Sequence, residues 1–467
     1  MKIYQFSFPV WACALALTTL TYSGCNFRST NTPRPENRSP TLFEQAVVRP
    51  ATYADELTLE STGLILPAIP KDLVAGTTPV KQKSVGLNAH PWNDFAIFPG
   101  IHAIRCYISS QYAWQPGGLF VQPMAQAYTE TTHGFDDYFQ RAVDQQVDVI
   151  ATIHQTPEWY VNTGRGDGGN NNAPGKIGVD RTKPAFYKDY AAFLWQFTAR
   201  YGRVKYADSL LRVDQTAQYP NQPKNGKKSG LGTLTYIEPW NEEKWWKLGT
   251  PEYIQPEEMA ALMSAVYDGH EGALGAGVGI KTADSSMVVL MPGLTDFDLA
   301  YTVAMDEWFK AHRKDKKWPC DILNYHHYSN LGNTILRHPP AWIEGGGCFP
   351  AEDKNFLTVR QVVAFARRLD KPLWITECGY DTRSPSPMHL MGKGMTDEQA
   401  QGEALVATCK AYFAEGVERV FIFTGPEEPG NTAGGLWQTS GVVGNAASGY
   451  KPKAALRILA DYIGSLK

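Results

Sequence analysis

The stretch "TLTYIEPW", residues 233–240, is a short run of apolar, β-branched and aromatic residues that ends directly before Asn241 and Glu242. Such a run predicts a buried β-strand with polar residues at its carboxyl end. Seven further runs of the same kind are "SVGLNAH" (84–90), "HAIRCYI" (102–108), "VDVIATIHQT" (147–156), "MVVLMPGL" (287–294), "DILNYHHY" (321–328), "PLWITECGY" (372–380) and "RVFIFTG" (419–425).

Segments with a helical pattern separate most of these runs, for example 135–147, 184–202 and 398–416, and another, 452–466, follows the last one. Alternating strands and helices predict parallel β/α units, and eight such units predict an α/β protein with a (β/α)8 TIM barrel. The first unit fits least well, because "PWNDFAIFPGI" is too short for a good helix. A doubly wound open sheet is the structural alternative.

Long inserts interrupt the pattern, and most follow the carboxyl end of a predicted strand, where a barrel has its active face. They are residues 109–134, 157–182, 203–232, 329–355 and 381–396. The stretch 162–175 is rich in Gly, Asn and Asp but lacks the spaced acidic residues of a calcium loop, so we expect a turn-rich loop and no metal there.

The N-terminus reads as a targeting segment. Lys2 precedes an apolar stretch, and "LTYSGC" ends at Cys25, as in a bacterial lipoprotein signal cleaved before a lipidated cysteine. An ordinary secretory signal or a membrane anchor is the alternative. We expect a signal peptide over 1–24, a flexible proline-rich tether over 25–40, and one catalytic domain over 41–467. The protein would then be lipid-anchored in the cell envelope, periplasmic or surface-exposed.

Composition narrows the class of partner. The net charge is −3 without a long basic run, so we expect no nucleic acid partner, and an aromatic content of 12% suits a carbohydrate ligand as well as a core. We expect no cofactor, and the oligomeric state does not follow from the sequence. Cys106 and Cys378 lie inside predicted strands and read as buried thiols, whereas Cys320 and Cys348 could pair.

Polar residues gather at the predicted strand ends, which places them together on one rim of a barrel. They are Arg105 in strand two, His154 and Trp159 in and after strand three, Asn241 and Glu242 after strand four, His326 to Tyr328 in strand six, and Glu377 in strand seven. Two carboxylates after strands four and seven would project over one cavity.

These motifs resemble those of the clan A glycoside hydrolases, which are retaining barrel enzymes with catalytic glutamates after strands four and seven. "IEPWNEEKWW" (237–246) resembles the "WNE" acid/base motif, "LWITECGY" (373–380) the nucleophile motif, and "HHY" (326–328) the His-x-Tyr pattern of strand six. "SGYKPKAALRIL" (448–459) resembles the usual end of such barrels. The resemblance covers residues 84–467 and is nearest to families 39 and 5. Two departures are Glu243, where proline is common, and "FTG" in strand eight, where a tryptophan is usual.

The resemblance implies a retaining β-glycosidase that acts on a poly- or oligosaccharide. Glu242 would be the acid/base, with its pKa raised among tryptophans, and Glu377 the nucleophile, held ionised by Arg105 and Tyr328. Asn241 would donate to the 2-hydroxyl of the substrate. Glu243 would face away, and its use as proton donor is the alternative.

Further candidate sugar contacts are hydrogen bonds from His90, His154 and His326, and stacking on Trp92, Trp159 and Trp437. A zinc hydrolase would need clustered ligands, whereas the adjacent His326 and His327 point to opposite faces of a strand. Transfer of the glycosyl group to another sugar, and a non-catalytic sugar-binding lipoprotein, are the alternative functions.

Overall fold

The computed structural model describes residues 58–59, 64–65, 83–115, 119–120, 134–161, 173–175, 180–215, 225–244, 252–295, 299–328, 343–344, 356–383, 386, 389, 391–392, 394–428 and 437–466. All structural statements concern this part of the chain. The predicted signal, Cys25 and the tether lie outside it, as do Cys348 and most of the predicted long inserts. Among the described residues, no helix combines the length and the apolar character needed to cross a membrane.

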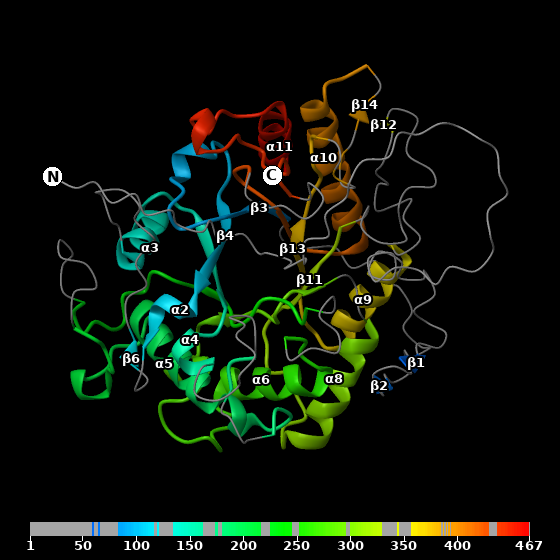
Figure 1. The fold of residues 1–467 in the computed structure, drawn as a ribbon. Coiled ribbons are helices and arrows are strands. Elements are labelled where there is room, and N and C mark those ends of the chain that lie inside the picture. Colours follow the sequence, from blue (N-terminus) through cyan, green and yellow to red (C-terminus); the bar gives the residue numbers. More distant parts are fainter. Residues whose placement is uncertain are drawn as a thin grey trace, which may run out of the picture.

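One parallel sheet runs through the centre of the molecule (Figure 1). Its order in the described residues is β10-β11-β13-β15-β3-β4-β7-β8-β9. The strands are β3 (Ser84–Ala89), β4 (Ala103–Ser109), β7 (Asp148–His154), β8 (Tyr236–Glu238), β9 (Val288–Val289), β10 (Leu294–Thr295), β11 (Leu323–His326), β13 (Leu373–Cys378) and β15 (Arg419–Ile422). Each overlaps one of the eight predicted runs.

The two ends of this sheet meet in one short segment. β9 pairs with β8 and β10 pairs with β11, yet only residues 290–293 separate β9 from β10 in the chain. Within that segment Gly293 forms a parallel bridge with Asn241, and Leu290 forms one with Ile322. The sheet is therefore curled, and the carboxyl ends of its strands lie at the same rim.

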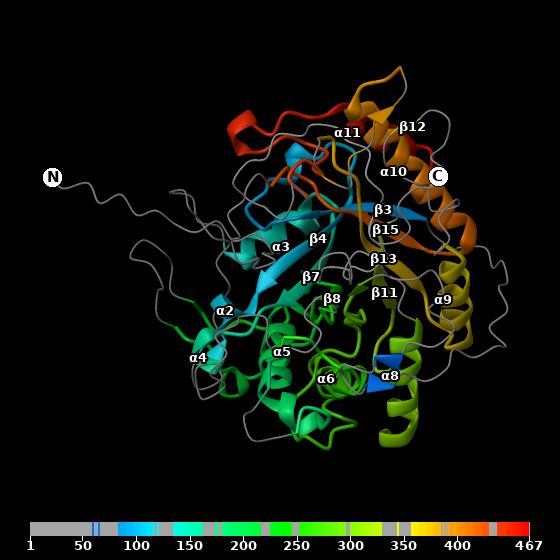
Figure 2. The ribbon, with the colours of Figure 1, turned by 45° about the vertical axis from the view of Figure 1, so that its right-hand side comes forward.

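Helices cover the outside of the sheet, and α10 lies beside α11 in both views (Figures 1 and 2). The longer helices are α3 (Phe135–Asp144), α5 (Lys188–Tyr201), α6 (Pro256–Asp268), α8 (Leu299–His312), α9 (Phe356–Arg368), α10 (Asp397–Glu415) and α11 (Ala454–Gly464). Short helices are α2 (Ser110–Ala113), α4 (Glu158–Val161) and α7 (Ile280–Ala283), and 3₁₀ turns are Phe95–Ile97, Pro184–Tyr187, Asp208–Leu210 and Ala446–Ser448. Antiparallel pairs join β1 (Thr58–Leu59) to β2 (Leu64–Ile65), β5 (Trp114–Gln115) to β6 (Leu119–Phe120) and β12 (Ile343–Glu344) to β14 (Met391–Gly392).

Local sequence signals explain where the helices begin and end. Thr396 and Gln399 form a capping box at the start of α10, and Gly416, with φ of 112°, ends it in the left-handed conformation. The predicted segment 184–202 begins as the 3₁₀ turn and continues as α5. Between β3 and β4 the connection contains only the 3₁₀ turn Phe95–Ile97, as the short "PWNDFAIFPGI" predicts.

An apolar layer fills the inside of the curled sheet below the rim. It consists of Ala103, Ile150, Leu290, Ile322, Trp374 and Phe421. Gly86 makes room for it, since a Cβ there would lie 2.5 Å from the Phe421 ring. Because side chains alternate along a strand, the inward residues two positions further on form a second layer, which is polar: Asn88, Arg105, Thr152, Asn324 and Thr376.

The outward side chains pack against the helices. Cys106 is fully buried against Tyr138 of α3, and Cys378 is buried near Cys409 of α10. His327 contacts the hydroxyl of Tyr412, also in α10, through its Nδ1. The prediction of buried thiols in these strands is confirmed, and the opposite orientation of His326 and His327 is as expected too.

Candidate active site

A buried arginine and a buried glutamate join the strands below the rim. Arg105 Nε lies 2.6 Å from Glu238 Oε2, and neither side chain is exposed. The same oxygen accepts a hydrogen bond from Thr152 Oγ1 at 2.7 Å, while Oε1 accepts from Gly293 N at 2.8 Å and Asn324 Nδ2 at 2.9 Å. Four donors therefore hold Glu238 in place, and Glu238 in turn fixes the guanidinium.

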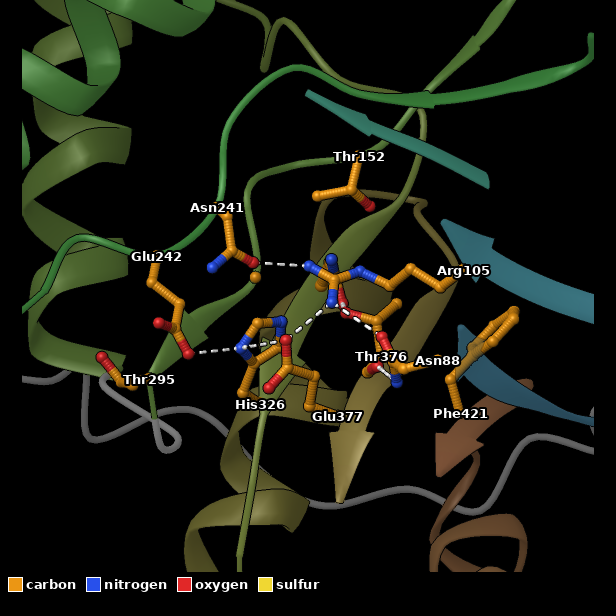
Figure 3. Close-up of polar contacts among 12 residues, drawn as sticks. Asn88, Arg105, Thr152, Asn241, Glu242, Thr295, His326, Thr376, Glu377 and Phe421 are labelled. Atoms are coloured by element: carbon orange, nitrogen blue, oxygen red, sulfur yellow. Dashed lines mark hydrogen bonds and ion pairs between the residues drawn. The ribbon is translucent and has the colours of Figure 1, made fainter. Parts of the chain in front are cut away.

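The other guanidinium nitrogens of Arg105 point toward the rim (Figure 3). Nη1 donates to Glu377 Oε1 at 2.6 Å, to Asn88 Oδ1 at 2.9 Å and to the Tyr107 hydroxyl at 2.7 Å. Nη2 donates to Asn241 Oδ1 at 2.6 Å. Because a guanidinium has only donors, the oxygen of the Asn241 amide faces it, and the NH₂ group is left to donate elsewhere.

Glu377 is surrounded by donors and positive charge. The Tyr107 hydroxyl also donates to Oε1, and the Tyr328 hydroxyl donates to Oε2 at 2.8 Å, the bond that the sequence analysis expects. Burial by itself raises the pKa of Glu377, but the charges of His326 and Arg105 and both tyrosine hydrogen bonds outweigh it and hold the pKa below its usual value. This carboxylate is thus kept ionised.

A bulge in β13 turns Glu377 inward. Tyr325 of β11 pairs with Ile375, but the next residue, His326, pairs with Glu377, so Thr376 is skipped in the register. Thr376 also faces inward, since its hydroxyl donates to Asn324 Oδ1 at 2.7 Å. Bulges commonly redirect a side chain at a functional site, and here two consecutive residues reach the same interior.

Glu242 faces Glu377 across the rim but lies in a different environment. One oxygen of Glu242, one nitrogen of His326 and one oxygen of Glu377 all lie within 4.8 Å of one another. Burial raises the pKa of Glu242, and the negative charge of Glu377 adds to this against the opposing effect of His326. The backbone φ of Glu242 is 59°, a strained conformation for a residue other than glycine that is typical of functional sites.

His326 lies fully buried between the two carboxylates. Its Nδ1 is 2.7 Å from Glu242 Oε1 and 3.5 Å from Glu377 Oε1, and their charges outweigh burial and raise its pKa. The rest of the ring packs on Gly293, where a Cβ would lie 2.1 Å from Nε2. The sequence predicts that His326 hydrogen-bonds a sugar hydroxyl, and the structure places its Nδ1 beside Glu242.

Glu243 points away from this pair. Its Oε2 accepts a hydrogen bond from Thr295 N at 2.9 Å, its Oε1 accepts from the Thr295 hydroxyl, and it is buried. Its backbone carbonyl accepts from Ile254 N at 3.0 Å. The orientation agrees with the expectation that Glu243 faces away from the catalytic pair.

His154 and His90 flank Tyr107 at the rim. The His154 ring lies edge-on to the Tyr107 ring at 5.6 Å, and burial, with the nearby Lys244, lowers the pKa of His154 to about 3, so its imidazole is neutral near pH 7. His90 Nε2 lies 2.6 Å from Glu428 Oε1, and its ring stacks on the exposed Trp92 at 4.2 Å.

Two of the predicted sugar-stacking residues, Trp437 and Trp159, have different neighbours in the structure. Trp437 lies beside Tyr328, whose hydroxyl donates to Glu377; the two rings are 4.2 Å apart, and the backbone N–H of Trp437 donates to Asp381 Oδ2 at 2.9 Å. Trp159 instead packs edge-on to Trp114 at 5.5 Å and donates to the carbonyl of Trp114 at 2.9 Å. The contacts described for Trp159 are therefore those of a packing residue.

The sequence analysis did not single out Asn88, Tyr107, Glu238 or Asn324. The alternation of strands carried a signal for Tyr107 and Asn324, because each lies two residues from a predicted site residue, Arg105 or His326, on the same face. Glu238 is inside "TLTYIEPW" itself, where an acid in an apolar run marks a buried partner for a cation.

The trio Glu242, His326 and Glu377 also raises the question of a metal, because three ligand atoms lie within 4.8 Å. The donor set argues against that use. Both oxygens of Glu377 already accept hydrogen bonds, and the Arg105 guanidinium at 2.6 Å would repel a cation. The cluster fits a pair of carboxyl groups, one ionised and one protonated, better than it fits a zinc site.

No family model matches the chain, and no curated protein matches it. Among solved structures, it is similar to an endo-β-1,4-mannanase from Thermotoga petrophila, with TM-score 0.46 and 10% identity over 83% of this chain and 77% of that one. It is also similar to an endo-1,4-β-mannanase from Rhizomucor miehei (TM-score 0.43, 12% identity, 84% and 96%) and to a GH5-4 broad specificity endoglucanase from Clostridium acetobutylicum (TM-score 0.43, 10% identity, 81% and 96%). At these values the likeness assigns no activity to this chain.

Proposed function

We propose that this protein is a retaining glycoside hydrolase, with Glu377 as nucleophile and Glu242 as acid/base. The observation that carries the proposal is the pair itself: one oxygen of Glu242 lies within 4.8 Å of one oxygen of Glu377, and the surroundings shift the pKa values of the two carboxyl groups in opposite directions. Such a pair, with one group ionised and the other protonated, is the requirement for acid-assisted displacement at a sugar.

The short separation favours retention. Retaining enzymes hold their two carboxyl groups about 5–5.5 Å apart, whereas inverting enzymes leave about 6.5–9.5 Å for a water molecule. In the first step Glu377 bonds to the anomeric carbon as the glycosidic bond breaks, and the proton of Glu242 passes to the leaving oxygen. In the second step Glu242 takes a proton from water, whose oxygen displaces Glu377. The amide NH₂ of Asn241, with its oxygen fixed by Arg105, would donate to the 2-hydroxyl.

The architecture supports the same assignment. If β9 and β10 are counted as one interrupted strand, the curled sheet has eight strands, as a (β/α)8 barrel requires. The catalytic candidates then lie at the carboxyl ends of strands four and seven, and Arg105 and Tyr107 lie on strand two. In such barrels the carboxyl ends carry the active site.

The proposed substrate is a β-linked poly- or oligosaccharide outside the cytoplasm. The sequence "LTYSGC" supports a lipid anchor on Cys25. The Cys25→Ala variant should be released from membranes or fail to mature, as fractionation of cells would show. Normal processing and continued membrane association of this variant would rule out the anchor.

Hydrolysis is best tested on a panel of purified β-polysaccharides and aryl β-glycosides, with the anomeric form of the first product followed by NMR. The β-anomer should appear first. Products longer than the substrate would instead indicate transfer to another sugar. Absence of turnover on the entire panel, in a protein that binds the same polysaccharides, would favour the non-catalytic alternative.

A further inference from the structure

Three side chains form a patch on the rim next to the candidate active site, and we call His90, Trp92 and Glu428 the rim patch. His90 follows β3, and Glu428 follows β15, the neighbouring strand in the sheet. His90 Nε2 lies 2.6 Å from Glu428 Oε1, and the His90 ring stacks on the Trp92 ring at 4.2 Å with an angle of 9°. Two strands thus hold the patch together.

One face of Trp92 remains open. Trp92 is 47% exposed although His90 covers one face of its indole, and the side chain of Glu428, which contacts His90, is 20% exposed. A flat apolar surface, with a partly exposed carboxylate on the other side chain that His90 contacts, matches a pyranose ring, which offers a face of C–H groups and an edge of hydroxyls. Because His90 already holds the indole in place, little side-chain conformational entropy would be lost when a sugar binds.

The rim patch is continuous with the catalytic candidates. The His90 ring lies 6.2 Å from the ring of Tyr107, and the Tyr107 hydroxyl donates to Glu377. A saccharide with one unit between Glu242 and Glu377 can therefore place the adjoining unit over Trp92.

We infer that the rim patch is a second sugar subsite, which binds an uncharged pyranose unit adjoining the unit that is cleaved. Trp92 stacks on this unit, and Glu428, oriented by His90, accepts hydrogen bonds from its hydroxyls. A uronic acid is disfavoured there, because its carboxylate would lie beside that of Glu428. The inference rests on the proposed glycosidase function.

The test compares the 4-nitrophenyl β-glycoside of a monosaccharide with that of the matching disaccharide. Pairs built from glucose, mannose and xylose are first assayed with the unmodified enzyme, and the pair on which it is most active is used for the variants. Trp92→Ala should lower kcat/KM on the disaccharide roughly ten- to thirtyfold and leave the monosaccharide within about twofold. Glu428→Gln should lower kcat/KM on the disaccharide by a smaller factor. It should also reduce the preference of the enzyme for this neutral disaccharide over one that ends in glucuronic acid.

Two further variants serve as matched controls for Trp92→Ala and Glu428→Gln. Leu210→Ala removes another exposed apolar side chain, and Glu418→Gln changes the acid directly before β15, at the other end of that strand from Glu428. Both should leave the two substrates unaffected. Equal losses on both substrates, or no loss in Trp92→Ala, would overturn the subsite. If the unmodified enzyme cleaves none of the pairs, the proposed function fails rather than the subsite alone.

Discussion

Glu238 Oε2 lies 2.6 Å from Arg105 Nε, and both side chains are fully buried. The acid on strand β8 thereby holds the arginine that touches Glu377, although none of the contacts described for Glu238 is with Glu242 or Glu377. Removal of Glu238 would leave a buried guanidinium with one carboxylate fewer, which is strongly unfavourable in a low-dielectric interior.

We therefore expect Glu238→Ala to lower the free energy of unfolding by about 3–5 kcal/mol. Chemical denaturation at pH 7 would measure it. The Glu243→Ala variant is a useful comparison, because Glu243 is a second buried acid in the same segment and accepts hydrogen bonds from Thr295. A Glu238→Ala protein as stable as the parent would mean that this ion pair does not hold the interior together.

The two tyrosines on Glu377 make a matched pair of variants. Tyr107→Phe and Tyr328→Phe each remove one hydroxyl that donates to an opposite oxygen of the nucleophile. Each should lower kcat roughly ten- to a thousandfold without loss of the fold, as steady-state kinetics and circular dichroism would show. Full activity in Tyr328→Phe would contradict the assignment of strand β11 to the site.

The pH profile follows from the two shifted carboxyl groups. Turnover needs Glu377 ionised and Glu242 protonated, so kcat/KM should fall below the lowered pKa of Glu377 and above the raised pKa of Glu242. Loss of a hydroxyl that stabilises the ionised form raises the pKa of Glu377, so Tyr328→Phe should move the acidic limb to higher pH. A profile with an unmoved acidic limb would argue that this bond does not act on the nucleophile.

Metal chelation separates the carboxylate pair from a zinc site. Because Arg105 and both tyrosines donate hydrogen bonds to the two oxygens of Glu377, dialysis against EDTA should leave hydrolysis unchanged. Loss of activity that added zinc restores would identify Glu242, His326 and Glu377 as ligands.

The strands were predictable from the sequence because their apolar runs are short and bounded by polar residues. "LWITECGY" also placed Glu377 correctly at a strand end, but strict alternation does not foresee that both Thr376 and Glu377 face inward. That depends on the register between β11 and β13, which is a tertiary feature. The contacts of His326 and the burial of Glu238 depend likewise on neighbours more than 80 residues away.

Trp159 shows a second limit. A tryptophan after a strand end suits a sugar platform and a packing residue equally, and the sequence does not say which neighbours it meets. In the structure Trp159 packs against Trp114, which belongs to the predicted insert 109–134. Trp437 lies beside Tyr328, and its backbone N–H donates to Asp381, a contact that no local pattern predicts.

The most direct test of the central claim is azide rescue of Glu377→Ala and Glu242→Ala on a substrate with a good leaving group. Without Glu377, azide should attack the anomeric carbon once and give a glycosyl azide of inverted configuration. Without Glu242, the glycosyl-enzyme should form and accumulate, and azide, which needs no base, should release it with retained configuration. Glu243→Gln should stay within roughly tenfold of the parent. Retained azide product from Glu243→Ala but not from Glu242→Ala, or full activity in both the Glu242 and Glu377 variants, would contradict the account.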